Sequence, residues 1–137
     1  YTLMIEARVT KGNPVRAGFQ LVSVFEADNL NAGTFLENSN ELGINTRDNR
    51  DYIEHRGAKN FVEGVANWSF DWQAPIAPAG ALVKMYYSAN IANGDGGSGG
   101  DHPVSASSTY SLQGQDSDLA MNIRGTHAMC GNLNSGA

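Results

Sequence analysis

The chain of 137 residues is poor in cysteine and in charge, and it lacks any long apolar run. A single cysteine, Cys130, cannot form a disulfide within the chain, so a hydrophobic core has to stabilise the fold. No segment approaches the roughly 18 consecutive apolar residues that span a bilayer, and no transmembrane segment is predicted. No secretory leader is visible and Tyr1 enters directly into a strand pattern, so we expect a mature or truncated fragment.

Basic residues are scarce as well. The nine Lys and Arg residues are outnumbered by fourteen Asp and Glu residues, and the net charge is −5. Binding to the phosphate backbone of nucleic acid requires clustered cations, so we exclude this class of partner. One loose basic group does occur, and it comprises Arg47, Arg50, Arg56 and Lys59. It is either a solvated charged loop or a patch for a small anion or a sulfated sugar.

The sequence also lacks the common catalytic motifs. It contains no Gly-x-Ser-x-Gly elbow, no phosphate-binding loop and no His-Glu-x-x-His pair. Glu54 beside His55, or Asp71 among the tryptophans, has the residue type for acid-base work, but such work also requires a defined geometry. We therefore expect that the protein is not an enzyme, and we assign no catalytic residues.

The most informative segment that is present, residues 66–73, alternates between apolar and polar side chains. Trp68, Phe70 and Trp72 fall on one side of an extended strand, because successive side chains in β structure point to opposite faces. Three large rings on one face could stack on sugars if they were exposed, but in a small domain they carry much of the apolar area that a core buries. The pattern predicts a strand with one face in the core and the other in water.

Further segments predict an all-β fold in a single domain, and the 16 glycines suit turns between short strands. Residues 1–10 alternate as a half-buried strand, with Ile5 on the apolar face and Glu6 on the opposite face. Residues 18–26 are almost continuously apolar, which is typical of a central strand. The domain is assigned to residues 1–112, followed by a tail or linker over residues 113–137. The predicted strands cover residues 1–10, 18–26, 52–55, 66–73, 81–91 and 104–112.

A glycine-rich loop over residues 93–101 joins the last two predicted strands as the tip of a hairpin. Calcium takes about six to eight oxygen ligands, and the two carboxylates of this loop match no EF-hand spacing. The loop is a candidate for cation or ligand binding, or it is a flexible tip whose Asp side chains make local turns. Its oxygen donors are Asn93, Asp95, Ser98 and Asp101.

Three soft metal ligands lie together in the tail, namely His127, Met129 and Cys130. They could suit copper, and His102 is the obvious further ligand. A blue-copper site draws its ligands from separate strands, however, so these side chains are alternatively incidental residues of a tail. We leave the metal unassigned.

Five motifs occur in a defined order and spacing over roughly residues 1–112. They are Gly18-Phe-Gln-Leu21, Ala32-Gly-Thr-Phe35, Tyr52-Ile-Glu-His55, the tryptophan-rich strand and the loop over residues 93–101. This set resembles the reeler domain, in particular its bacterial cell-surface relatives. The resemblance implies an immunoglobulin-like antiparallel β-sandwich outside the cell, but it names no ligand, because one fold hosts many functions. Animal reeler domains have paired cysteines and some are described as heparin-binding; this chain departs from their cysteine pattern, which favours a microbial source.

His55 closes one of these motifs, and a lone histidine near a strand end is commonly a hydrogen-bonded structural residue. The resemblance implies an alternative, because the bacterial relatives often carry a Cys-x-x-Cys-His segment upstream of the first strand of this chain. That pattern attaches a c-type haem, for which His55 would be the second axial ligand.

Together these observations predict a secreted or cell-surface module for binding, adhesion or assembly. Its partner would be a protein or a surface glycan that meets the loop at residues 93–101 and residues near 47–59 at one end of the sandwich. A chain that begins in mid-strand would also pair with a neighbour's strand, so a homo-oligomer or a larger assembly is a natural state. The alternative function is electron transfer with a c-type haem, and Ca²⁺ is the other candidate cofactor.

Overall fold

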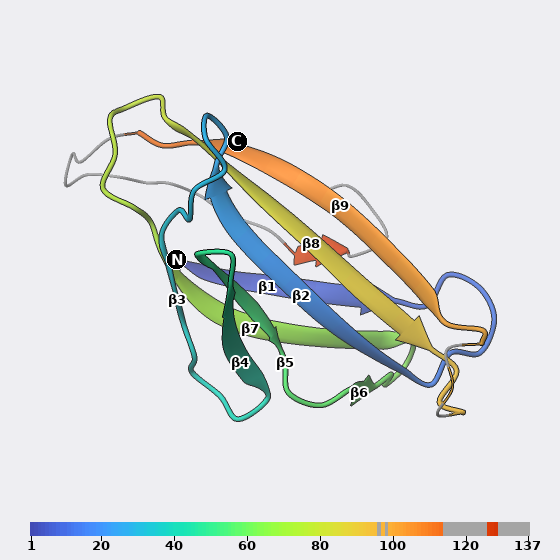
Figure 1. Ribbon diagram of the computed structural model, residues 1–137. Coiled ribbons are helices and arrows are strands. Elements are labelled where there is room, and N and C mark those ends of the chain that lie inside the picture. The colour runs from blue at the N-terminus through green and yellow to red at the C-terminus, as the bar shows by residue number, and fades with distance from the viewer. Residues whose placement is uncertain (96, 98, 114–125, 129–137) are drawn as a thin grey trace.

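The computed structural model describes residues 1–113 apart from 96 and 98, together with residues 126–128. In this part of the chain ten strands form two sheets (Figure 1). A helix long and apolar enough to cross a membrane is not found among these residues. The strands are β1 (Thr2–Arg8), β2 (Arg16–Phe25), β3 (Thr34–Leu36), β4 (Leu42–Arg47), β5 (Arg50–His55), β6 (Lys59–Asn60), β7 (Val65–Gln73), β8 (Leu82–Ala92), β9 (His102–Ser111) and β10 (Thr126–Ala128).

The two sheets pack face to face as a sandwich. One sheet has the strand order β10-β1-β7-β3, and the other has the order β4-β5-β2-β8-β9 with β6 beside β2. Figure 1 shows β2, β8 and β9 in one layer, with β1 and β7 behind them. Among the described strands every pair is antiparallel except β1 with β10, which run parallel. The predicted all-β sandwich is confirmed.

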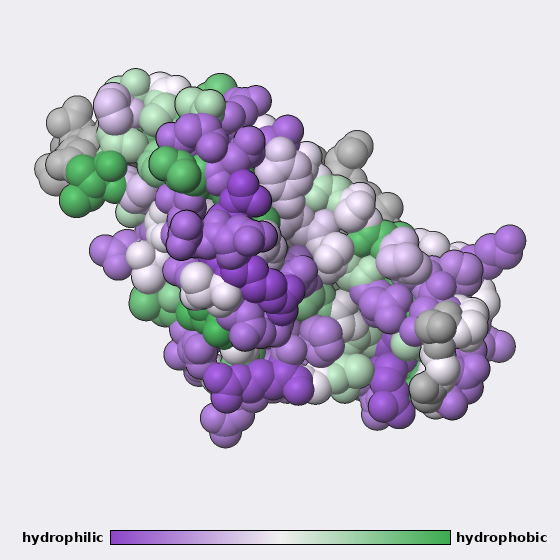
Figure 2. All heavy atoms as spheres, viewed as in Figure 1, coloured by the Kyte–Doolittle hydropathy of each residue, from purple (hydrophilic) through white to green (hydrophobic). Residues whose placement is uncertain are grey.

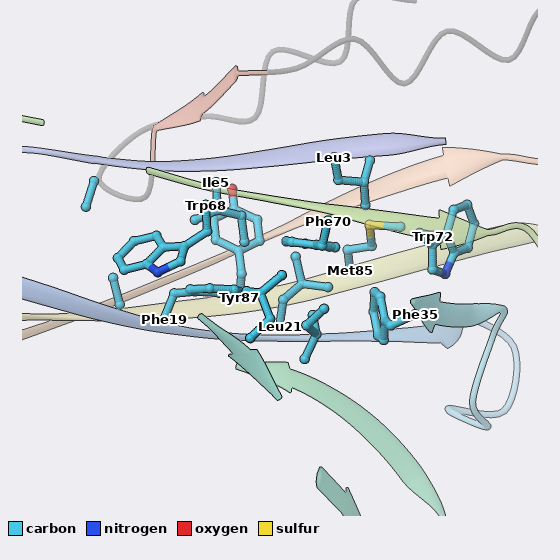
Figure 3. Close-up of a cluster of buried hydrophobic side chains, with 14 of the residues drawn as sticks. Leu3, Ile5, Phe19, Leu21, Phe35, Trp68, Phe70, Trp72, Met85 and Tyr87 are labelled. Carbon is cyan, nitrogen blue, oxygen red and sulfur yellow. The ribbon is translucent and has the colours of Figure 1, made fainter. Parts of the chain in front are cut away.

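The core lies between the sheets and is built around the aromatic face of β7. Trp68, Phe70 and Trp72 are at most 2% exposed, and Figure 3 shows them among the side chains that fill the space between the two layers. Phe19 of β2 meets them, with its ring centroid 4.9 Å from that of Trp68 and 5.9 Å from that of Phe70. The tryptophan-rich strand therefore supplies the core, as predicted.

The Ala32-Gly-Thr-Phe35 motif holds Trp72 in this core. The indole Nε1 of Trp72 donates a hydrogen bond to the carbonyl oxygen of Ala32 over 3.2 Å. Gly33 has a φ of 77°, and a Cβ added to it would lie 2.5 Å from Trp72 Nε1, so glycine alone fits there. Phe35 then packs edge-on against Phe70 at a centroid distance of 5.8 Å. Packing on Trp72 therefore explains the glycine of this motif, and packing on Phe70 explains its phenylalanine.

One residue differs from the sequence-based expectation, and one short strand lies outside the predicted ones. Glu6, expected on the solvent side of the first strand, is only 6% exposed, and its carboxylate forms an ion pair with Arg8 on the same face of β1. The segment Thr126–Ala128 belongs to the region expected to be a linker or an ordered tail that leans on the sandwich, and it pairs with the edge of β1 as β10. Alternation cannot detect either feature, because it is blind to ion pairs and to strands of three residues.

Candidate functional site

An open pocket of about 450 Å³ lies at one end of the sandwich. The connection between β1 and β2 forms one wall, and the end of β8 with the start of β9 forms the other (Figure 1). Its volume lies within the range of about 300–1,000 Å³ that is typical of small-molecule sites. The apolar part of its lining consists of Val9, Pro14, Ile91 and Val104.

The pocket is basic although the protein is acidic. Arg8, Lys11 and His102 contribute to the lining, and no Asp or Glu is among the described residues that line it. The Nε of Arg8 pairs with Glu6, which offsets part of its charge. Lys11 has no ion pair within the described part of the chain. Because a concave site lined by one sign of charge concentrates the opposite sign, this pocket suits an anion that meets the Lys11 ammonium.

The loop over residues 93–101 borders this end, and its first carboxylate is used in a local turn. Asp95 Oδ1 accepts a hydrogen bond from the Gly97 N–H over 2.8 Å, and Asp95 Oδ2 accepts one from Asn93 Nδ2 over 3.0 Å. Asn93 Nδ2 also donates to the carbonyl oxygen of Gly99. This arrangement favours the interpretation of Asp95 as a turn residue.

The second carboxylate of the loop is bound less completely. Asp101 Oδ2 accepts a hydrogen bond from Asn90 Nδ2 over 3.0 Å, whereas Asp101 Oδ1 is buried without a hydrogen bond among the described residues. Ser98 lies outside those residues. Among the described carboxylate oxygens of the predicted cation ligands, Asp101 Oδ1 is therefore the one that accepts no hydrogen bond.

His55 stands where β5 separates from β2. The last β2–β5 pair is Gln20 with Glu54, and the β2–β6 ladder resumes at Ala17 with Lys59. In the gap between the two ladders, His55 Nδ1 lies 3.0 Å from both the backbone nitrogen and the carbonyl oxygen of Phe19. The imidazole thus replaces a missing strand partner, accepting from the N–H or donating to the C=O according to its tautomer. These contacts favour the structural interpretation of His55.

The loose basic group is divided among separate acceptors. Arg47 pairs with Glu54, Arg56 with Glu37 and Lys59 with Glu41, at N–O distances of 3.3, 3.0 and 2.8 Å. The Nε of Arg50 donates to the carbonyl oxygen of Asn29 over 2.9 Å. Since three of the four cations already face a carboxylate, this geometry favours charged side chains on a solvated surface over an anion patch.

The soft ligands of the tail fall largely outside the described residues. Met129 and Cys130 lie outside those residues, and the backbone of His127 pairs with that of Ile5. His102 is exposed at the start of β9 and lines the basic pocket. Within the described residues, no group of three or more His, Cys, Asp and Glu side chains is placed to hold a metal ion.

We compared the chain with models of protein families, with curated proteins and with solved structures, and no match was found. The assignment of a site therefore depends on the geometry of this chain.

The sequence did not single out Arg8 or Lys11 as site residues. Lys11 belongs to a Lys-Gly-Asn-Pro segment that predicts a turn, and nothing in a turn motif shows which other loop it approaches. The pocket could have been found only from the strand topology, because the topology places the β1–β2 and β8–β9 connections at the same end of the sandwich.

Proposed function

We propose that this chain is a non-catalytic binding module, secreted or displayed at the cell surface, that holds an acidic sugar of a surface glycan in the basic pocket. The pocket carries this proposal, because it combines a Lys11 ammonium that is unpaired within the described residues with apolar side chains on both of its walls, namely Val9, Pro14, Ile91 and Val104. A uronate residue offers the matching groups. Its carboxylate would bind Lys11, and the C–H face of its ring would pack on these apolar side chains.

The proposal assigns no catalytic role, and the structural roles of the acid-base candidates Glu54 and His55 support this. Glu54 accepts hydrogen bonds from Gln20 and Arg47 and contacts Asn45, so its carboxylate serves a surface network of strand side chains. His55 bonds to the backbone of Phe19. Both groups stabilise the β2–β5 region, which is separate from the residues that line the pocket.

The extracellular location and the immunoglobulin-like form of the sandwich belong to the same proposal. They are supported by the reeler-like motifs, two of which have a packing role: Gly33 admits the Trp72 indole, and His55 closes the gap beside Phe19. Residues that fill such roles are expected to recur wherever this sandwich is built.

Calorimetric titration with glucuronate and with glucose tests the binding proposal. We expect glucuronate to bind and glucose to bind at least tenfold more weakly, since loss of a charge-assisted hydrogen bond costs about 1.5–3 kcal/mol. Lys11→Glu should abolish glucuronate binding. Lys84→Glu is the matched control, because Lys84 does not line the pocket and lies seven residues along β8 from Ile91, roughly 23 Å from that lining residue. Equal binding of the two sugars, or equal loss in both variants, would show the proposal to be wrong.

A further inference from the structure

The outer edge of β9 carries no partner strand among the described residues. β9 is the last strand of the larger sheet, and no other strand in the described part of the chain pairs with its outer side. It runs for ten residues, from His102 to Ser111, in unbroken register with β8. An edge of this length without a bulge is a template for strand addition.

The register identifies the backbone groups that point outward from this edge. The carbonyl oxygens of Leu82 and Ala92 accept hydrogen bonds from the β2 side, so even-numbered residues of β8 face β2 and odd-numbered residues face β9. The Leu112 N–H donates to Ala81 O, which extends the same alternation to β9. Even-numbered residues of β9 therefore bond to β8. The N–H and C=O groups that remain unpaired within the described residues belong to Ser105, Ser107, Thr109 and Ser111.

The side chains of these four residues do not guard the edge. Proteins commonly protect an edge strand with Lys, Pro, an inward charge or a bulge; Pro103 stands near the start of β9, and residues 104–111 have none of these. All four side chains are exposed hydroxyls. Figure 2 shows pale, weakly polar atoms along this edge, in contrast to the strongly hydrophilic surface over β4 and β5. A second copy can therefore approach without charge repulsion at the contact, although the chain carries a net charge of −5.

We propose that β9 pairs antiparallel with β9 of a second copy about a two-fold axis at Ser107, which joins the two larger sheets into one. This register places Ser105 opposite Thr109 of the second copy, and hydroxyl side chains opposite one another are a favourable cross-strand pair. Pro103, which has no N–H to donate, falls at the end of the interface opposite Ser111. No like-charged side chains face each other in this register.

The inner face of β9 favours the same register. Val104, Ala106, Ser108 and Tyr110 are only partly buried, so β9 extends beyond full cover by the facing sheet. Pairing about Ser107 sets Val104 opposite Tyr110 of the second copy, and a β-branched residue opposite an aromatic ring is a stabilising pair. Val104 belongs to both proposed surfaces, but Ser107, at the two-fold axis, does not line the sugar pocket, so substitutions of Ser107 test the pairing separately from sugar binding.

Cysteine cross-linking of the full chain tests the register, in a Cys130→Ser background. Directly opposed residues in a hydrogen-bonded antiparallel pair have Cα atoms about 5.5 Å apart, within disulfide range, so Ser107→Cys should give a disulfide-linked dimer on mild oxidation. Ser105→Cys is the matched control. Its two introduced thiols, one in each copy, would lie four residues apart along the pair, roughly 14 Å, and should not cross-link. Equal cross-linking of both variants, or of neither, would overturn the proposal.

Sedimentation equilibrium provides the second measurement, on the chain without added cysteines. Ser107→Lys would place two ammonium groups opposite each other, and we expect the dimer dissociation constant to rise about tenfold. Ser69→Lys makes the same change at an exposed position of β7 in the other sheet and should leave the dissociation constant unchanged. A wild-type chain that stays monomeric at all concentrations, or equal effects of both substitutions, would also overturn the proposal.

Discussion

Substitution of Gly18 by alanine is expected to displace His55 and to destabilise the fold. Gly18 is buried in β2, directly beneath the imidazole. A Cβ added to Gly18 would lie 2.8 Å from His55 Nδ1 and still closer to Cε1 and Nε2, which real Cβ atoms essentially never do. The neighbouring ring therefore has to move, and its contact with the Phe19 backbone has to break.

The magnitude follows from two contributions. Overpacking of a well-packed site costs about 1–3 kcal/mol, and loss of one hydrogen bond costs about 1 kcal/mol. We expect Gly18→Ala to lower the free energy of unfolding by about 2–4 kcal/mol. In a His55→Ala background the ring is absent, so the same substitution should cost less than about 1 kcal/mol. The coupling between the two substitutions then exceeds about 1 kcal/mol, as is usual for residues in direct contact.

Urea denaturation followed by tryptophan fluorescence measures these energies, because Trp68 and Trp72 are buried in the core. Gly57→Ala is the matched control: its added Cβ meets nothing within 4 Å, and we expect a change of at most about 1 kcal/mol. Additive effects of Gly18→Ala and His55→Ala would refute the reasoning. So would a Gly18→Ala variant as stable as the wild-type chain.

Three further predictions concern single side chains. Burial raises the pKa of Tyr110 from 10.0 to about 12. Between pH 10 and 12 the folded state therefore keeps the phenol proton that the unfolded chain loses, so the free energy of unfolding should fall as the pH rises through this range. The fall should be smaller in Tyr110→Phe. The binding proposal predicts a featureless visible spectrum for the protein isolated from its native source, whereas the electron-transfer alternative predicts a Soret band, a haem-sized added mass and loss of normal ligation in His55→Ala. Because both Asp95 oxygens are hydrogen-bonded, we expect Ca²⁺ to leave the melting temperature unchanged; a rise abolished by Asp101→Ala would instead support the calcium site.

The core was predictable because alternation reports burial directly. The aromatic face of β7, the central position of β2 and the β8–β9 hairpin all follow from side-chain periodicity and are confirmed. Each depends on many apolar side chains acting together, so one misplaced residue does not change the result. Glu6 illustrates the limit, since an ion pair with Arg8 lets a carboxylate occupy a buried position that alternation assigns to water.

The candidate sites were less predictable, because residue type does not reveal whether a polar group is already satisfied. Lys59 illustrates this: its ammonium binds Glu41 and the Asn67 carbonyl and lies 5.5 Å from the centroid of the Trp68 ring. By sequence it is a free cation near other cations. Lys11 has the same chemistry but stands in a turn beside the pocket, and only the three-dimensional arrangement of the loops distinguishes the two.

The two proposed surfaces lie where sequence periodicity carries least information. A strand's alternation specifies its faces, but it is silent about its edges, because N–H and C=O groups are the same at nearly every residue. In β9 the sequence therefore predicts a half-buried face for the even-numbered side chains and an ordinary polar surface for the odd-numbered ones. Only the position of β9 at the end of the strand order makes those polar residues an edge that has no partner in the described part of the chain. Recognition by this sandwich is thus expected at strand edges and strand ends, whereas the aromatic core that dominates its sequence supports them.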